Sequence, residues 1–164
     1  MISKEMEKTI NEQIKFEFYS GYVYLAMAAY FDANDLPGFA AWFKAQSQEE
    51  YKHAMRFYDY VYERGGKVAL EAIDKPKSDY KSLKDIIEMA LHHEEAVTRL
   101  IYKMVELARE MKDYMTENML AWFVAEQVEE EANMQTLLNR LERVKDSGNG
   151  LIMLDKELGK RKEG

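Results

Sequence analysis

The 164-residue sequence has no cysteine, only two prolines and only eight glycines. Without cysteine it forms no disulfides, thiolate zinc sites or iron–sulfur clusters, and it has no cysteine nucleophile. No apolar run approaches the roughly 20 residues of a membrane-spanning helix. The N-terminal residues also lack the apolar core of a secretory signal. We therefore expect a cytoplasmic protein that does not associate with membranes.

Charge of one sign predominates modestly, with 30 acidic against 23 basic residues and a net charge of −7. This balance disfavours binding to the nucleic-acid backbone and weakly favours cationic ligands. With 47% hydrophobic residues the chain can bury a core, so composition excludes disorder and we expect one domain over residues 1–164. Only three histidines are present, so any metal chemistry would depend mainly on carboxylates.

The few glycines and prolines divide the chain into helical segments. Breaks fall at Pro37-Gly38, from Gly65 to Pro76, and around Gly148 and Gly150. The segments between them are rich in Glu, Lys, Ala, Leu and Met, which favour helices. A one-residue slip of the apolar phase indicates another turn near residue 112. We therefore predict helices at about 4–34, 38–64, 82–111, 114–146 and 151–161.

Four long helices predict an all-α, four-helix bundle with a short fifth helix near the C-terminal end. The connection over residues 65–81 is much longer than the other loops. Its residues at about 3.3 Å each reach about 55 Å, whereas a helix of about 28 residues is only about 42 Å long. We therefore expect a long crossover that joins two antiparallel helical hairpins.

Six polar residues interrupt the apolar stripes of the four long helices near their middles. They occupy positions that the three- and four-residue spacing marks as buried: Glu17, Glu50, His53, Glu94, Gln127 and Glu130. In each hairpin these positions agree in height to within about one helical turn. Four buried carboxylates would have to protonate unless cations neutralised them, and two divalent ions do so. Oxygen ligands with a single imidazole favour iron or manganese.

Other interpretations of these acids stay open at this point. The six residues could instead form a protonated or water-filled polar layer in a metal-free bundle. Three further acids lie one helical position away from the interior stripes, where a solvated acidic face is the alternative to a metal site: Glu49, Glu126 and Glu129.

Aromatic and histidine residues near these positions have simpler interpretations. Tyr24 lies on the first stripe, two turns after Glu17, and packing in the core explains it more simply than a redox role. His92 and His93 lie off the stripe of Glu94, so we expect them at the surface or in an interface. The other aromatic residues are expected in packing or subunit contacts.

The polar positions resemble those of the bacterial non-haem ferritins over essentially the whole chain. The resemblance rests on Glu17, the run Glu50-Tyr51-Lys52-His53, Glu94 and the run Glu126-Gln127-Val128-Glu129-Glu130. It implies a single ferritin-like di-iron domain that oxidises Fe(II) with O₂. It also implies self-association into a hollow shell of twenty-four subunits that stores a hydrated ferric oxide mineral.

The resemblance also implies roles for individual residues. The six interior positions would form the ferroxidase centre, with Glu50 bridging two irons, and Tyr24 would supply an electron during oxygen reduction. A third iron site would consist of Glu49, Glu126, Glu129 and Glu130.

The sequence departs at two points from related di-iron proteins, and these departures distinguish it from one branch of the ferritins. General di-iron bundles carry two Glu-x-x-His pairs, whereas Gln127 and Glu130 replace the second pair here. This argues against bacterioferritin. Bacterioferritins bind haem through a methionine just before the metal-binding histidine, where this chain has Lys52, so we expect iron but no haem.

Two other classes of function remain. A di-iron oxygenase or peroxidase would need a substrate pocket, and no stripe has a run of small residues beside the acids to open one. A metal-free scaffold would have no use for acids at matched height. The sequence leaves open the oxidant, the entry pores, the reductant, and whether Gln127 or Glu130 contacts metal directly.

Overall fold

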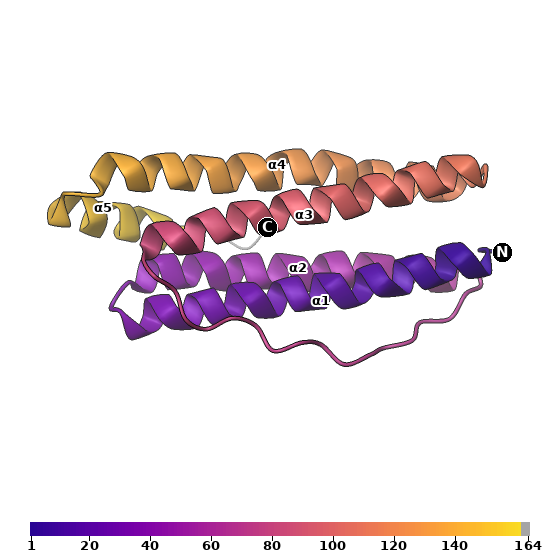
Figure 1. The fold of residues 1–164 in the computed structure, drawn as a ribbon, viewed down its shortest axis with the longest axis horizontal. Helices are drawn as coiled ribbons and strands as arrows, with labels where there is room; N and C mark the ends of the chain where they lie inside the picture. Colours follow the sequence, from indigo (N-terminus) through magenta and orange to yellow (C-terminus); the bar gives the residue numbers. More distant parts are fainter. Residues whose placement is uncertain (162–164) are drawn as a thin grey trace. The chain divides into compact units, whose positions relative to one another are not determined.

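The computed structural model describes residues 1–161, which form five α-helices and contain no strand. The helices are α1 (Lys4–Ala33), α2 (Pro37–Glu63), α3 (Leu83–Glu110), α4 (Tyr114–Val144) and α5 (Gly148–Leu158) (Figure 1). Two compact units are present among the described residues, one of residues 1–79 and 144–161, the other of residues 80–143. Over the described residues, no helix has both the length and the apolar character to cross a membrane.

The four long helices begin and end within two residues of their predicted bounds, and local capping explains why. The Ser3 hydroxyl accepts a hydrogen bond from the backbone N–H of Met6 at 3.1 Å, and Ser82 caps α3 in the same way. Pro37 occupies the first turn of α2, where its missing N–H costs nothing. The turn predicted near residue 112 is confirmed, because Lys112 leaves the helical conformation with φ of 55°.

The prediction for the fifth helix was wrong by three residues at each end. We interpreted Gly148 and Gly150 as a break, but both lie in the first turn of α5. Ser147 caps this turn, because its hydroxyl accepts a hydrogen bond from the N–H of Gly150 at 3.0 Å. A strong N-cap therefore outweighs the low helix propensity of two glycines.

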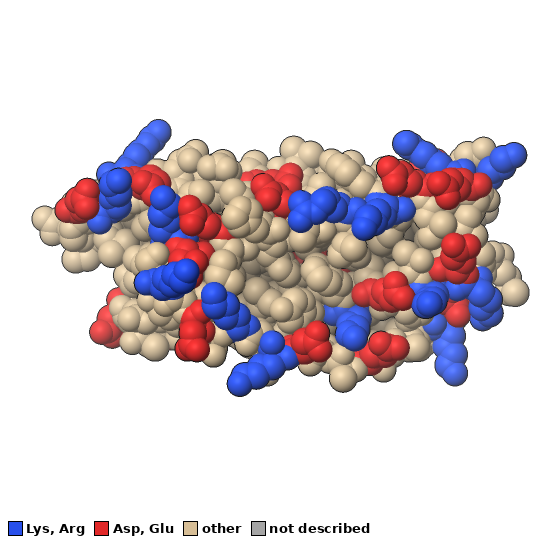
Figure 2. Space-filling model, in the orientation of Figure 1, with Lys and Arg blue, Asp and Glu red and all other residues tan. Residues whose placement is uncertain are grey.

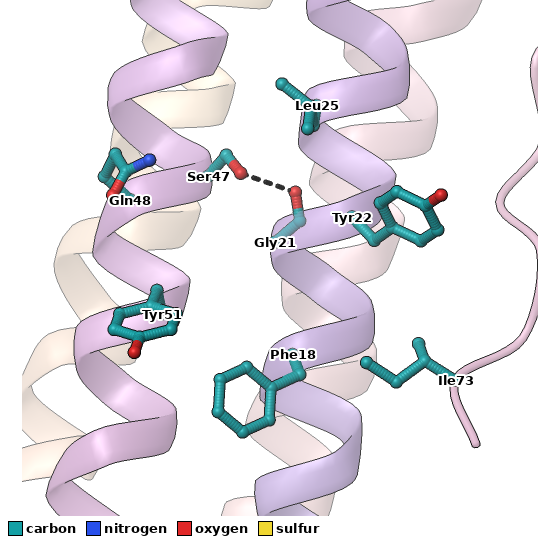
Figure 3. Close-up of a pocket in the computed structure, with 8 residues that line it drawn as sticks. All are labelled: Phe18, Gly21, Tyr22, Leu25, Ser47, Gln48, Tyr51 and Ile73. Atoms are coloured by element: carbon teal, nitrogen blue, oxygen red, sulfur yellow. Dashed lines mark hydrogen bonds between the residues drawn. The ribbon is translucent and has the colours of Figure 1, made fainter.

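In the first unit, α1 and α2 pack as an antiparallel hairpin with aromatic side chains near the loop. The ring of Phe31 packs against those of Phe39 and Phe43, with centroids 5.0 Å and 5.2 Å away. Further along, the Ser47 hydroxyl donates to the carbonyl of Gly21 at 2.7 Å (Figure 3). A Cβ at Gly21 would lie 3.2 Å from the Ser47 carbonyl, so this glycine permits the close approach of the two helices.

The long connection after α2 runs along α1 (Figure 1). The backbone N–H of Lys67 donates to Glu7 at 3.0 Å. The Asn11 side chain donates to the Lys67 carbonyl at 3.0 Å and accepts from the N–H of Ala69 at 2.7 Å. Further on, Ile73 lies in a groove beside α1. Side chains of α1 thus satisfy backbone groups of a segment that has no secondary structure of its own.

In the second unit, α3 and α4 form another antiparallel hairpin. Three side-chain contacts define its register: Lys84 with Glu142 at 2.8 Å, Gln127 with Glu94 at 3.1 Å, and Arg109 with Glu117 at 2.6 Å. The contact between Gln127 and Glu94 joins two of the interior polar residues. The prediction that these residues lie at matching heights along the hairpin is therefore confirmed.

The short helix α5 docks on the start of α2. Leu36 precedes α2 and offers no side-chain cap. Instead, Asp155 of α5 accepts a hydrogen bond from the backbone N–H of Phe39 at 2.8 Å. The backbone of α5 lies so close that a Cβ on Gly38 would be 1.6 Å from the Asp155 carbonyl oxygen. A long-range contact therefore supplies the cap that the local sequence lacks.

Charged side chains of both signs alternate on the face drawn in Figure 2, and neither sign forms a continuous patch there. Ion pairs between exposed side chains occur in the structure, such as Lys44 with Asp32 at 2.7 Å. Exposed pairs of this kind contribute little to stability. Nothing on this face marks a binding site for a highly charged macromolecule.

Candidate metal centre

Three predicted ligands converge inside the first unit. Glu17 comes from α1, and Glu50 and His53 come from α2; all three are buried. One ligand atom from each lies within 4.8 Å of the other two. His53 Nδ1 is 3.3 Å from Glu50 Oε2 and 3.9 Å from Glu17 Oε2. The three-residue spacing of Glu50 and His53 places both side chains on the same face of α2.

Each carboxylate is held by a glutamine four residues earlier on its own helix. Gln13 Nε2 donates to Glu17 Oε1 at 2.8 Å, and Gln46 Nε2 donates to Glu50 Oε1 at 3.2 Å. Sequence analysis assigned no role to either glutamine, although the i, i+4 spacing is a recognisable signal. The Oε2 atoms of both carboxylates are the ones that approach His53. Two oxygens and an imidazole nitrogen thus face one another, a donor set that suits iron or manganese.

Glu17 is the residue whose surroundings best fit a cation-binding position. Its Oε2 atom is buried and has no hydrogen-bond partner among the described residues. Burial first, and then the negative charge of Glu50, raise the pKa of Glu17 well above its ordinary value. Buried polar atoms are almost always paired, so this oxygen fits a position that a bound cation completes.

Replacing Glu17 by glutamine is therefore expected to stabilise the metal-free protein at neutral pH, by about 1–3 kcal/mol. Because the folded-state pKa is raised, the glutamate costs stability only above its unfolded pKa, and this cost grows as pH rises. The stabilisation by Glu17→Gln should accordingly shrink as pH falls towards 4.5, the ordinary value. Thermal unfolding of both chains in chelator, at one protein concentration and several pH values, checks this. An equal difference at all pH values would contradict it.

A second group of predicted residues meets within the hairpin of α3 and α4. Gln127 Nε2 donates to Glu94 Oε2 at 3.1 Å, to the Glu94 carbonyl at 3.2 Å and to Thr98 Oγ1 at 3.2 Å. Glu94, Gln127 and Glu130 are all buried. Gln127 thus orients a carboxylate from the facing helix, as Gln13 and Gln46 do within theirs, and its amide nitrogen is engaged in doing so.

The other predicted site residues have varied surroundings. Glu49 is half-buried and forms an ion pair with Arg161 at 2.8 Å. Glu126 is half-buried, whereas Glu129 is exposed. Tyr24 is fully buried on α1 and packs against the ring of Phe43, with centroids 6.0 Å apart, which accords with the simpler interpretation as a core residue.

Of the two histidines outside the stripes, His92 is confirmed at the surface, whereas His93 is partly enclosed. His92 is exposed and His93 is half-buried. Desolvation lowers the pKa of His93 to about 4, so this side chain is neutral at physiological pH. Neither residue belongs to the cluster of Glu17, Glu50 and His53.

Comparison with known proteins identifies the family. Residues 7–144 match the model of the ferritin-like domain, a span that contains every residue of both buried groups. This chain belongs to the ferritin family. The bacterial non-heme ferritin of Staphylococcus aureus (strain MRSA252) is 40% identical over 161 residues, which cover 98% of this chain and 97% of that protein. The bacterial non-heme ferritin of Staphylococcus saprophyticus is also 40% identical over 161 residues.

Solved structures of ferritins match the fold over the full length. An engineered closed form of the Archaeoglobus fulgidus ferritin has a TM-score of 0.99 and 44% identity, covering 100% of both chains. The open-pore ferritin of the same archaeon has a TM-score of 0.97 and 44% identity, covering 99% of this chain and all of that one. The predicted fold class is therefore confirmed: this ferritin is an all-α, four-helix bundle with a short fifth helix.

Proposed function

We propose that this ferritin stores iron by oxidising Fe(II) at a buried di-iron centre. One observation carries the proposal: the buried Oε2 atoms of Glu17 and Glu50 converge with His53 Nδ1, and that of Glu17 has no hydrogen-bond partner among the described residues. Membership of the ferritin family and the match to solved ferritins support it. Iron is here the substrate that becomes the stored product.

Charge balance supports a centre that takes two ferrous ions. The four interior carboxylates are Glu17, Glu50, Glu94 and Glu130, and all are buried. Two Fe(II) ions carry four positive charges, which matches four carboxylates, and unmatched charge in a buried site is costly. We propose that the two buried groups act together as this centre, with Glu50 contacting both ions and Gln127 orienting Glu94. Glu49, Glu126, Glu129 and Glu130 are proposed as a third iron site.

The proposed reaction balances when O₂ accepts the electrons. Each of two Fe(II) ions gives up one electron, O₂ accepts both, and two protons from water complete hydrogen peroxide. The ferric product then hydrolyses to the oxide that is stored. The protein's part is to hold two metal ions close together with positions open to O₂. Tyr24 is buried on α1, and we propose that it gives an electron when the third site is also filled: three Fe(II) ions and Tyr24 then supply four electrons, O₂ is reduced to two water molecules with three protons from water and one from Tyr24, and Tyr24 is left as a neutral radical. No haem is proposed.

We further propose that copies of this chain assemble into a hollow shell of twenty-four subunits. The open-pore ferritin among the structural relatives supports assembly. The first unit presents an apolar groove of about 310 Å³, lined by residues of α1, α2 and the long connection. Figure 3 shows Phe18, Tyr51 and Ile73 around it. Exposed aromatic and aliphatic side chains gathered in this way are typical of subunit contacts, so we propose a second copy as its occupant.

Replacing Leu25 by lysine is expected to weaken assembly. Leu25 lines the groove and is 45% exposed, so a charge there would be buried without a partner when a second copy covers it. Leu70→Lys is the matched control, because Leu70 is 69% exposed and lies outside the groove. Light scattering after size separation should show smaller particles for Leu25→Lys alone. Equal particle sizes would show that this groove is not a subunit contact.

We propose that residues 1–164 form one ferritin-like domain, because the family match runs from residue 7 to 144 without interruption and so includes residues of both compact units. The cytoplasmic location expected from the sequence is also a proposal. It accords with a protein that needs ferrous iron from a reducing compartment.

The experiment that tests the proposed function is aerobic loading of metal-free protein with Fe(II), followed by size separation and measurement of iron per chain. Storage predicts iron far beyond the two or three ions that the carboxylates can bind, in a large soluble particle. Iron that stops at about two per chain would instead indicate a di-iron enzyme acting on another substrate. No retained iron would show that the buried acids are structural.

A further inference from the structure

Arg161, after the end of α5, holds a stripe of three residues on α2. Its Nη2 atom donates to Glu49 Oε2 at 2.8 Å and to Gln46 Oε1 at 3.0 Å. Its Nη1 atom donates to the carbonyl of Trp42 at 3.3 Å, and its guanidinium carbon lies 4.2 Å from the centroid of the Trp42 ring. All four residues belong to the first unit.

These contacts differ from an ordinary surface ion pair. The side chains of Arg161 and Glu49 are only 17% and 20% exposed. A planar guanidinium that stacks on an indole and donates three hydrogen bonds is held in one orientation. Exposed ion pairs are weak because solvent screens them and both side chains stay mobile. Arg161 is partly shielded from solvent and its side chain is held in place, so neither source of weakness applies to it fully.

The contacts also reach the candidate metal centre. Gln46 is bonded at both ends of its amide, since Oε1 accepts from Arg161 and Nε2 donates to Glu50 Oε1 at 3.2 Å. Arg161 is therefore bonded directly to one proposed iron ligand, Glu49, and through one amide to another, Glu50.

We propose that Arg161 is a built-in counter-ion of Glu49, which a metal ion must displace before it binds this carboxylate fully. The inference rests on the proposed function, which assigns Glu49 to a third iron site. A guanidinium and a divalent ion that share one carboxylate repel each other, so the arginine lowers the affinity of Glu49 for metal. Binding at Glu49 then releases Arg161 from α2, and the release couples metal occupancy at this position to the C-terminal segment.

The test is an anaerobic titration of metal-free assembled protein with Co(II), which does not turn over, followed by calorimetry. The component of Co(II) binding that is lost in Glu49→Gln is assigned to Glu49, and its dissociation constant gives the affinity at that carboxylate. Arg161→Met keeps the apolar stem over Trp42 but removes the charge, and should raise that affinity about two- to fivefold, the upper part of the range expected for a partly exposed charge pair. Arg161→Lys keeps the charge but not the planar fork that donates three hydrogen bonds, and should raise that affinity less than Arg161→Met does. Lys160→Met is the matched control, because Lys160 is exposed, and should change nothing.

A merely structural role for Arg161 predicts the opposite sign, because loosening α2 would weaken metal binding. Unchanged or weaker binding at Glu49 in Arg161→Met would therefore overturn the inference, as would the absence of any Glu49-dependent binding. The same titration tests the proposed function separately. It requires Co(II) binding that is lost on removing Glu50 and His53, whatever happens at Glu49.

Discussion

Replacing both Glu50 and His53 with alanine is expected to abolish rapid Fe(II) oxidation while the chain still folds and assembles. Glu50 Oε2 lies 3.3 Å from His53 Nδ1, and Glu17 Oε2 lies 3.9 Å from the same nitrogen. Losing an outer partner of a metal ligand already costs about 10–100-fold in activity. Removing two proposed ligands should therefore reduce the initial rate by about 100-fold or more, to near that of iron in buffer.

The loss should be specific to the centre. Removing buried charges that lack a bound cation does not in itself destabilise a protein, although truncation leaves a cavity and the amide of Gln46 without its carboxylate partner. Asp59→Ala is the matched control, since it removes an exposed carboxylate from the same helix. Stopped-flow absorbance of the ferric product measures the rates, and size separation measures assembly. Full activity in the double variant would exclude this cluster as the oxidation site.

The spacing of apolar residues and the positions of glycine and proline predicted most of the fold and the polar residues in its interior. Glu17 and Glu50 stood out because each interrupts an apolar stripe, and interruptions at matched heights are rare unless they meet. The same reasoning placed Glu94 beside Gln127, whose contact at 3.1 Å lies within one hairpin. Stripes of this kind depend only on helix geometry, which the sequence specifies locally.

What the sequence did not predict depends on contacts between distant residues. Arg161 lies far along the chain from Glu49, and nothing in the local pattern of either residue indicates that they meet. The cap that Asp155 supplies to α2 is of the same kind, because Leu36 and Pro37 suggest only where the helix starts. Gln13 is different: its spacing from Glu17 was visible, but an amide on a polar helix has many simpler explanations.

Replacing Gly38 with alanine is expected to displace α5 from α2 and to destabilise the protein by about 2–4 kcal/mol. The added Cβ would lie 1.6 Å from the carbonyl oxygen of Asp155 and 2.5 Å from its carbonyl carbon. These are backbone atoms of a helix, so no side-chain rotation relieves the overlap. The estimate combines about 1 kcal/mol for the cap on Phe39, lost as α5 moves away, with about 1–3 kcal/mol for overpacking.

Gly148→Ala is the matched control for this variant, because a Cβ there would meet nothing within 4 Å. The same chemical change should stabilise α5 by about 0.5–1 kcal/mol, since alanine favours a helix over glycine. Asp155→Ala separates the two parts of the effect, because it removes the cap on Phe39 without adding an atom between the helices. Hydrogen exchange should then show faster exchange in α5 for Gly38→Ala and slower exchange for Gly148→Ala. Equal protection of α5 in Gly38→Ala and the unaltered chain would mean that α5 does not pack on Gly38 as described. Because Arg161 lies three residues after the end of α5, Gly38→Ala should also weaken the hold on Glu49, and so raise the affinity for Co(II) at that carboxylate in the same direction as Arg161→Met.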